Sequence, residues 1–281
     1  MHTVILSIFC LIFLLASCTQ PATFKQISVN SQYAEVEKKE DVHKITDSTV
    51  TPFIYTKVIS LKELAVEEKK DKFVELLLPS ILVSHHVLHQ KIKRIEHIEN
   101  WLLKHPFMMK KDSLFLFSLF ETYKCDQTHE LKMRLKPHAT SIVLGQAALE
   151  SGWGSSRFFK EGNNVFGIWS YHADENRIKA LTGRDSTNIY VRSYSSIEES
   201  INDYFQTIAR VNAYKEFRQK RFTSEKPLEL ILFLKRYSEL GETYTDKLKQ
   251  LIESNDLTKY DSYVIKNEYF VEEEIRFSEK I

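Results

Sequence analysis

Glycine, proline and cysteine are all scarce in this sequence, and its charges almost cancel. Only 7 Gly and 6 Pro occur in 281 residues, which excludes a collagen-like chain. Three cysteines cannot build a disulfide scaffold. Lys+Arg 39 against Asp+Glu 38 leaves a formal charge of +1, so the overall basic field of a nucleic-acid-binding protein is missing and no nucleic-acid partner is expected. The 43% of hydrophobic residues excludes a disordered chain and suits one large domain or two small ones.

The first eighteen residues look like a bacterial export signal. An apolar run from Val4 to Ala16 has the length of a signal-peptide core and is too short to span a bilayer comfortably. It ends Leu-Ala-Ser-Cys, which resembles a lipobox, the site at which a bacterial lipoprotein receives its acyl chains. We therefore expect residues 1–17 to be removed and Cys18 to anchor the protein to a bacterial membrane in the cell envelope, facing the periplasm or the cell surface. An ordinary secretory signal cut near Ser17 is the alternative. One departure from the expected pattern is that the usual positive amino-terminal region is missing.

The stretch that follows is polar and shows no sustained period. It includes a charge run at residues 35–41, and we interpret residues 18–66 as a flexible tether. A coil of this length has a root-mean-square span of roughly 40 Å. The alternative is that the stretch wraps around the folded domain, with the apolar residues 58–61 forming a short strand or docking segment.

Residues 67–136 are predicted to form a helical region. Apolar residues recur at three- and four-residue steps between residues 71 and 102, although Pro79 should kink this helix or split it in two. A second helix over residues 114–123 would begin at Asp112 or Ser113 as its N-cap. The two helices would make a hairpin.

The next segment is rich in glycine and carries one unusual glutamate. Five of the seven glycines fall within 23 residues. Thr140 or Ser141 can cap a helix that ends at Gly152, which places Glu150 in the last turn. The negative end of the helix dipole and burial beside Trp153 would both raise the pKa of Glu150, as a general acid near neutral pH requires. On these residues alone, Glu150 is as easily a glutamate that points into solvent.

Several segments in this region, in a consistent order, resemble a known enzyme family. They are residues 72–79 (KFVELLLP), 146–154 (QAALESGWG), 162–169 (GNNVFGIW), 194–200 (YSSIEES) and 237–244 (YSELGETY). Together they resemble the glucosaminidase family, glycoside hydrolase family 73, and in particular its Bax-like branch. The likeness covers roughly residues 70 to 255. It implies a mainly α, lysozyme-like catalytic domain over residues 137–260 with a small β-hairpin, and it leaves residues 261–281 as a C-terminal tail.

The sequence between the matched segments is consistent with such a hairpin. Residues 188–194 are rich in β-branched and aromatic residues and follow a turn-prone stretch at residues 182–185. Ser196 and Glu199 then have the spacing of a capping box, which predicts that a helix begins there.

The resemblance also implies an activity and a set of site residues. It implies a peptidoglycan hydrolase that cuts β-1,4 bonds at N-acetylglucosamine in the glycan strands, with Glu150 as general acid and Tyr244 lying opposite it. An asparagine can bind a sugar acetamide, and aromatic rings can stack on a pyranose face, although both aromatic side chains of residues 162–169 could instead be core. The expected substrate-binding residues are Gln146, Trp153, Asn164, Phe166 and Trp169.

A second catalytic carboxylate is harder to place. Glycosidases usually use a pair of carboxylates. The hairpin region offers Asp174, Glu175 and Asp185, and none stands in a context that matches the family position. Assistance by the 2-acetamido group of the substrate is the alternative that we favour, since it needs only one carboxyl group.

Two other functions remain open at this stage. A lytic transglycosylase of the same fold would leave a 1,6-anhydro end, and a non-catalytic wall-binding lipoprotein would keep the cleft without the activity. No metal and no organic cofactor is expected, because the histidines at residues 85, 86, 89 and 97 have no acidic or thiol ligand at matching spacing.

Overall fold

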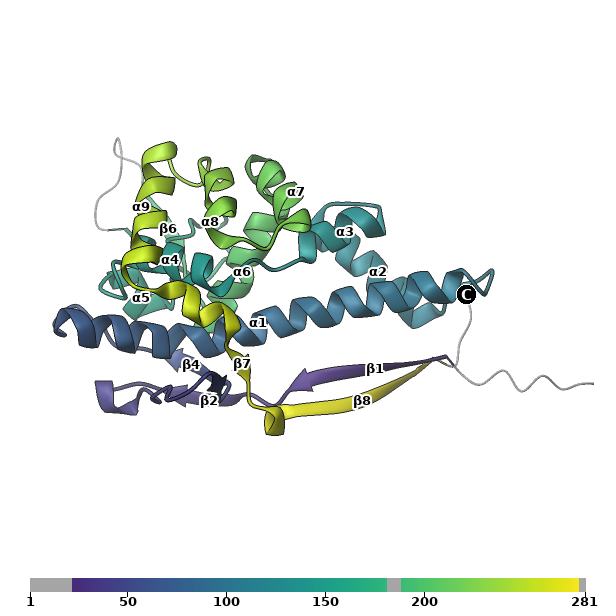
Figure 1. Ribbon diagram of the computed structural model, residues 1–281, viewed down its shortest axis with the longest axis horizontal. Helices are drawn as coiled ribbons and strands as arrows, with labels where there is room; N and C mark the ends of the chain where they lie inside the picture. Colours follow the sequence, from purple (N-terminus) through teal and green to yellow (C-terminus); the bar gives the residue numbers. More distant parts are fainter. Residues whose placement is uncertain (1–21, 181–187, 278–281) are drawn as a thin grey trace, which may run out of the picture.

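The computed structural model describes residues 22–180 and 188–277. One long helix, α1 (Val66–Leu102), runs through the molecule; at 1.5 Å per residue its 37 residues extend about 55 Å. The shorter helices lie on one side of α1 and the strands of both chain ends lie on the other (Figure 1). Within the described ranges, no helix is both long and apolar enough to cross a membrane.

The other elements are short. The remaining α-helices are α2 (Lys110–Tyr123), α3 (Thr128–Leu135), α4 (Thr140–Ser151), α5 (Arg157–Gly162), α6 (Ile197–Arg210), α7 (Lys215–Thr223), α8 (Pro227–Leu230) and α9 (Glu242–Ser254). The 3-10 helices are η1 (Lys39–Asp41), η2 (Asn212–Tyr214), η3 (Ile231–Leu234), η4 (Leu257–Ser262) and η5 (Asn267–Tyr269). The strands are β1 (Ala22–Val29), β2 (Gln32–Glu35), β3 (Thr49–Val50), β4 (Phe53–Lys57), β5 (Arg177–Lys179), β6 (Tyr190–Arg192), β7 (Val264–Ile265) and β8 (Phe270–Phe277).

The helical hairpin is confirmed, with two corrections. α1 continues through Pro79 as one helix, not two, because the apolar stripe on both sides of the proline is fully buried and holds the two halves in line. α2 begins at Lys110, so Asp112 is not its N-cap but lies in its first turn. The buried Asp112 carboxylate accepts hydrogen bonds from Arg94 of α1 at 3.1 and 3.0 Å, which ties the two helices together.

The predicted flexible tether is wrong over the described residues. β1 pairs antiparallel with β8 over its whole length, from Ala22 opposite Phe277 to Val29 opposite Phe270. β2 pairs with β4, and β3 with β7, both in parallel. The segment also buries apolar side chains against the core, namely Val36, Val42, Val50, Ile54, Tyr55, Val58 and Leu61. Residues 22–65 therefore wrap the domain, as the alternative expectation had it. The predicted tail contains the paired strands β7 and β8, joined through η5, and is not loose over the described residues.

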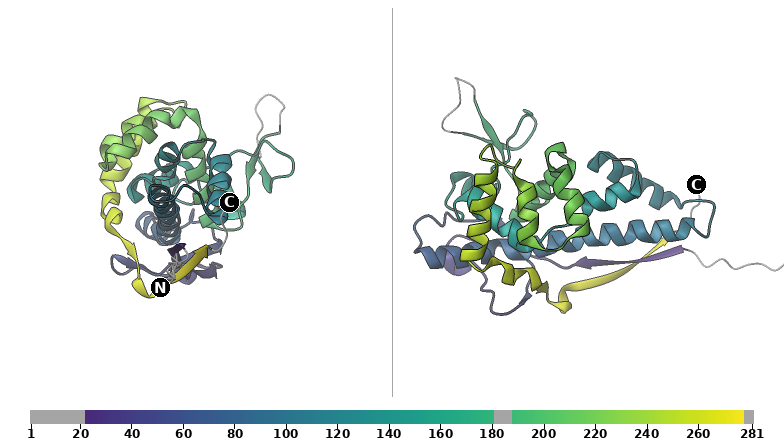
Figure 2. Two further views of the ribbon diagram at one scale, coloured as in Figure 1. Left: turned by 90° about the vertical axis from the view of Figure 1, so that its right-hand side faces the viewer. Right: turned by 45° about the horizontal axis from the view of Figure 1, so that its top comes forward.

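The predicted mainly α fold with a small hairpin is confirmed. α4 is buried along most of its length and packs against α1, α9 and η4. β5 and β6 pair antiparallel, with Ile178 opposite Val191, and the hairpin projects from the side of the helical layer (Figure 2). The predicted turn at residues 182–185, with the candidate Asp185, lies outside the described residues. At the start of α6, Ser196 Oγ accepts from Glu199 N at 3.1 Å, which is half of the predicted capping box. The Glu199 carboxylate binds Ser195 instead.

Candidate active site

The helix that carries Glu150 is fixed at both ends. It ends as predicted, with Gly152 in the left-handed region at φ +58°. Its beginning differs from the prediction, because neither Thr140 nor Ser141 supplies the capping oxygen. The Asp261 carboxylate does so from η4, accepting from Ser141 N at 2.7 Å and from Ser141 Oγ at 2.8 Å. This anchor compensates the free amides of the helix start and holds α4 to the C-terminal segment.

A glycine inside α4 lets a second helix come close. A Cβ atom at Gly145 would lie 2.8 Å from side-chain atoms of Leu248 and of Ile252, both fully buried on α9. A larger residue would therefore push α9 away. The close packing brings Tyr244, in the first turn of α9, to the side of Glu150.

Glu150 combines an exposed position with a raised pKa. The residue is exposed to solvent in the last turn of α4. The surrounding protein removes part of the solvation of its carboxyl group and raises its pKa, while a hydrogen bond from the Tyr244 hydroxyl acts in the opposite direction. Burial, and next the charge of Glu150, raise the pKa of Tyr244, so its hydroxyl stays protonated and can donate.

Gln146 does not bind substrate directly, contrary to the prediction. Its side chain is 0% exposed, one turn before Glu150 on α4. Its Oε1 atom accepts from the Tyr204 hydroxyl at 2.6 Å, and its Nε2 atom donates to the Tyr244 hydroxyl at 3.0 Å. Gln146 can therefore reach a substrate only through Tyr244.

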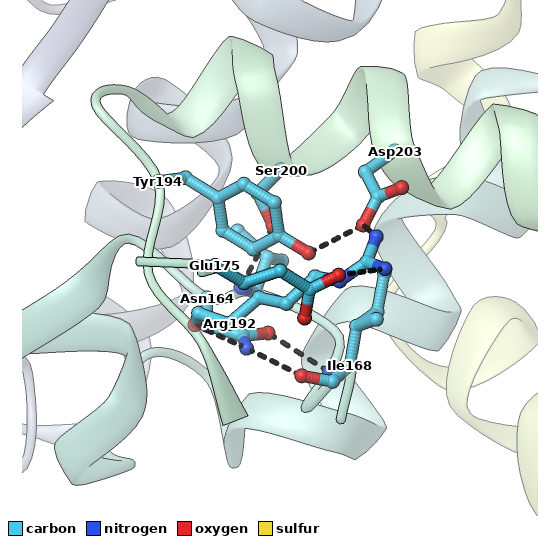
Figure 3. A network of polar contacts seen from close by, with 8 residues as sticks. Asn164, Ile168, Glu175, Arg192, Tyr194, Ser200 and Asp203 are labelled. Atoms are coloured by element: carbon cyan, nitrogen blue, oxygen red, sulfur yellow. Dashed lines mark hydrogen bonds and ion pairs between the residues drawn. The ribbon is translucent and has the colours of Figure 1, made fainter. Parts of the chain in front are cut away.

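Asn164 and Phe166 are also structural, and their predicted contact with sugar is wrong. Asn164 is 1% exposed and closes the loop around it: its Nδ2 donates to the carbonyls of Ile168 and Arg192, and its Oδ1 accepts from Ile168 N (Figure 3). Phe166 is buried and stacks on Tyr204 with ring centroids 4.1 Å apart. Neither side chain has a free face for a glycan.

Trp169 keeps a surface on which a sugar can stack. It is 45% exposed, and it lies 6.3 Å from the ring of Tyr171, which is 76% exposed. Tyr171 was not among the predicted residues, although its spacing of two from Trp169 is the signal for side chains on one face of an extended segment. Trp153 is half-buried with its ring edge against Phe73 of α1, at 5.4 Å, so most of its surface serves packing.

Glu175 is committed to an ion-pair network that supports the hairpin. Its Oε1 atom lies 2.7 Å from Arg192 Nη2, and Arg192 Nη1 lies 2.7 Å from the Asp203 carboxylate on α6 (Figure 3). Tyr194 donates to the same Asp203 oxygen at 2.6 Å. A hydrogen bond from Ser170, followed by the charge of Arg192, holds the pKa of Glu175 below its usual value. Glu175 is thus ionised, but its charge is neutralised by Arg192.

The other acidic candidates do not form a pair with Glu150 that the structure records. Asp174 is exposed, and Asp185 lies outside the described residues. Across residues 22–180 and 188–277, no three His, Cys, Asp or Glu side chains are grouped so that they could hold a metal ion. His86, one of the four histidines of α1, instead contacts the Ile27 carbonyl of β1 at 2.7 Å.

The part of the chain that carries this site is similar to known proteins. Residues 126–257 match the family model Glucosaminidase, described as mannosyl-glycoprotein endo-beta-N-acetylglucosaminidase. Protein bax of Escherichia coli strain K12 is 33% identical over 127 residues, which are 41% of this chain and 42% of that protein. Exo-glucosaminidase LytG of Bacillus subtilis strain 168 is 29% identical over 129 residues, 43% of this chain and 45% of that protein.

A solved structure was also matched. The catalytic domain of the autolysin Auto from Listeria monocytogenes is 26% identical, with coverage of 58% of this chain and 94% of that chain and a TM-score of 0.38. The chain spans less than half the length of the two curated relatives above. The matched segment contains Glu150, Tyr244 and the hairpin, and the likeness to Protein bax agrees with the branch that the sequence segments indicated. Residues 126–257 of this chain, 132 of its 281 residues, are thus similar to the glucosaminidase family.

Proposed function

We propose that this protein is a peptidoglycan hydrolase that cleaves β-1,4 glycosidic bonds at N-acetylglucosamine, with Glu150 as the general acid. One observation carries the proposal: in a segment that matches the glucosaminidase family model, Glu150 is a solvent-exposed residue whose carboxyl group is partly desolvated, has a raised pKa and accepts a hydrogen bond from a tyrosine hydroxyl. A raised pKa increases the protonated share of the carboxyl group at any given pH, and only the protonated form can protonate the leaving glycosidic oxygen.

The second catalytic group in this proposal is the substrate itself. The carbonyl oxygen of the 2-acetamido group attacks the anomeric carbon while the bond to the leaving sugar breaks, and water then opens the cyclic intermediate. The commitment of Glu175 to Arg192 supports this route, because a nucleophilic carboxylate would first have to leave its ion pair. In this proposal Tyr244, which is hydrogen-bonded to Glu150, orients the acetamide by accepting a hydrogen bond from its N–H group. Trp169 and Tyr171 are the proposed platform for a neighbouring sugar.

The products of digestion test this function against its two alternatives. Purified peptidoglycan treated with the full-length protein in detergent is expected to yield fragments with reducing N-acetylglucosamine ends, identified by mass spectrometry. Anhydro-muramic ends would identify a lytic transglycosylase instead. Binding to the wall without any cleavage would identify a non-catalytic wall-binding protein.

We also propose that Cys18 carries the lipid that holds the protein at a bacterial membrane. The fold supports a rigid spacer in place of the flexible tether. Phe24, six residues after Cys18, contacts His97 near the end of α1, whereas Trp153 contacts Phe73 near its beginning. These two positions of α1 are 24 residues apart, so the helix separates them by about 36 Å. In this proposal the length of α1 separates the Glu150 end of the domain from Phe24, the end of the described chain that is nearer to Cys18.

Replacement of Cys18 by serine tests this anchor. Cys18→Ser is expected to abolish the incorporation of labelled fatty acid and to leave the protein soluble or unprocessed, because the acyl chains supply the membrane affinity. Cys125→Ser is the matched control, since Cys125 is a free thiol, and it should keep both label and membrane association. Label that persists in the Cys18 variant would show that the lipid is attached elsewhere.

A further inference from the structure

A row of buried hydrogen bonds leads across the core to Glu150. Its members, in order, are Arg221, His138, Tyr204, Gln146, Tyr244 and Glu150. Arg221 Nη1 lies 3.2 Å from His138 Nδ1, and His138 Nε2 lies 2.7 Å from the Tyr204 hydroxyl. The other three contacts, which are Tyr204 to Gln146, Gln146 to Tyr244 and Tyr244 to Glu150, are those already described. The four members between the two ends are at most 4% exposed, and they come from four different segments of the chain.

The first member of the row determines the direction of every later bond. Burial lowers the pKa of Arg221 to about 9, so the guanidinium stays charged at neutral pH and can only donate. His138 Nδ1 must therefore accept. Burial and then the charge of Arg221 lower the pKa of His138 well below its usual value, so the ring is neutral and its single proton is on Nε2. The Tyr204 hydroxyl oxygen accepts a hydrogen bond from His138 Nε2, and the Tyr204 hydroxyl donates its own hydrogen bond to Gln146 Oε1.

The orientation of the Gln146 amide in turn determines the direction of its hydrogen bond with Tyr244. Because its oxygen faces the Tyr204 donor, its NH₂ group must face Tyr244. The Tyr244 oxygen is then an acceptor toward Gln146, and its own proton is left for Glu150. The amide does not readily gain or lose a proton, so the row orients hydrogen bonds and does not conduct protons to the surface.

We propose that Tyr204 is a positioning residue which, polarised by His138 and Arg221, fixes the Gln146 amide so that the Tyr244 hydroxyl donates its hydrogen bond to Glu150. The inference rests on the proposed role of Glu150 as general acid. Without the Tyr204 hydroxyl, the Gln146 amide has no partner that fixes its orientation. Turned over, it would present its oxygen to Tyr244 and accept the hydrogen bond that Glu150 now accepts.

The variant Tyr204→Phe tests the proposal. The phenylalanine keeps the ring that stacks on Phe166 and deletes only the hydroxyl. A carboxylate that loses a donor becomes easier to protonate, so the pKa of Glu150 is expected to rise by up to about one unit. A general acid works in its protonated form, so the alkaline limb of kcat/KM against pH should move up by the same amount. The groups that face Glu150 electrostatically are the tyrosines at 204, 214, 237 and 244, whose own pKa values are all raised, so none of them titrates in this range.

Two measurements keep this test separate from a test of the function. Carbon-13 NMR of glutamate carboxyl groups in the full-length protein, assigned with Glu150→Gln, gives the pKa of Glu150 without reference to activity. The matched control is Tyr55→Phe, since Tyr55 is also fully buried and its hydroxyl accepts a hydrogen bond, from His43 N at 3.0 Å, but it is not part of the row. That control should lose stability and keep both the Glu150 pKa and the pH profile.

The outcomes distinguish the two ideas. An unchanged NMR pKa of Glu150 in Tyr204→Phe, or an equal shift in Tyr55→Phe, overturns the positioning role. A shifted NMR pKa with an unchanged pH profile supports the orientation of Tyr244 and instead refutes Glu150 as the general acid. In Tyr204→Phe, a shift of the NMR pKa of Glu150 together with an equal shift of the pH profile supports both the positioning role of Tyr204 and the proposed function.

Discussion

The substitution Glu150→Gln is expected to lower peptidoglycan hydrolysis by about 10²–10⁴-fold, the range that one positioned general acid contributes. Glutamine keeps the shape of the side chain and can still accept a hydrogen bond from Tyr244, but it has no transferable proton. The fold should be unaffected or slightly stabilised, because the change removes a negative charge from the negative end of the α4 dipole. Steady-state rates on purified peptidoglycan and the midpoint of thermal unfolding measure the two effects separately.

A matched control makes this result specific. Glu161→Gln changes an exposed glutamate of α5 whose carboxylate pairs with Arg157 on the surface at 2.7 Å. Exposed ion pairs of this kind contribute at most about 1 kcal/mol to stability, so the control should hydrolyse the wall at nearly the wild-type rate. If Glu150→Gln were equally active, Glu150 would not be the general acid and the proposed mechanism would fail.

The parts of the site that follow from the sequence are those with a local cause. Gly152 is predicted to end α4 because a left-handed residue after a helix favours glycine, and this also fixes Glu150 in the last turn. The β6 strand follows from its β-branched and aromatic residues. In each case the residues that determine the conformation lie within a few positions of one another, so the pattern carries the whole reason.

The parts that the sequence does not predict depend on partners far along the chain. β1 is a strand because β8 lies beside it, about 250 residues later, and two-stranded ribbons of this kind leave no period in the sequence. The cap of α4 is Asp261, 120 residues from Ser141. Asn164 was expected to bind sugar, since an exposed amide and a buried one that closes a loop look alike until their neighbours are known.

The row beneath Glu150 shows the same limit for the active site. Tyr204 and His138 stand 66 residues apart, and neither belongs to a segment with an obvious catalytic pattern. Among the members of the row beneath Glu150, a sequence signal existed only for Gln146, within the segment that also contains Glu150, and for Tyr244, at the end of the segment 237–244. The role of Gln146 was predicted as substrate binding because spacing along a helix does not reveal which face is buried when the helix is apolar on all sides.

Tyr244→Phe is expected to reduce the rate more than any single change at Asp174, Glu175 or Asp185. If the acetamide is the internal nucleophile, a hydroxyl that orients it acts mainly in the transition state, and loss of such a group costs about 10²–10³-fold in kcat. The same substitution removes the hydroxyl that donates a hydrogen bond to Glu150. The pKa of Glu150 should therefore rise, and the alkaline limb of the pH profile should move to higher pH.

The carboxylate variants provide the comparison that decides the mechanism. Glu175→Gln removes one partner of Arg192, but Asp203 still holds the guanidinium, so the hairpin should stay in place and the rate should fall less than about tenfold. Asp174→Asn and Asp185→Asn are expected to be milder still. Steady-state rates on a defined glycan, with unfolding midpoints for all four variants, separate a chemical loss from a structural one. If the steady-state rate of one carboxylate variant fell by several orders of magnitude while its fold stayed intact, substrate assistance would be excluded. A single hairpin carboxylate contributes that much to the rate only as a base or a nucleophile.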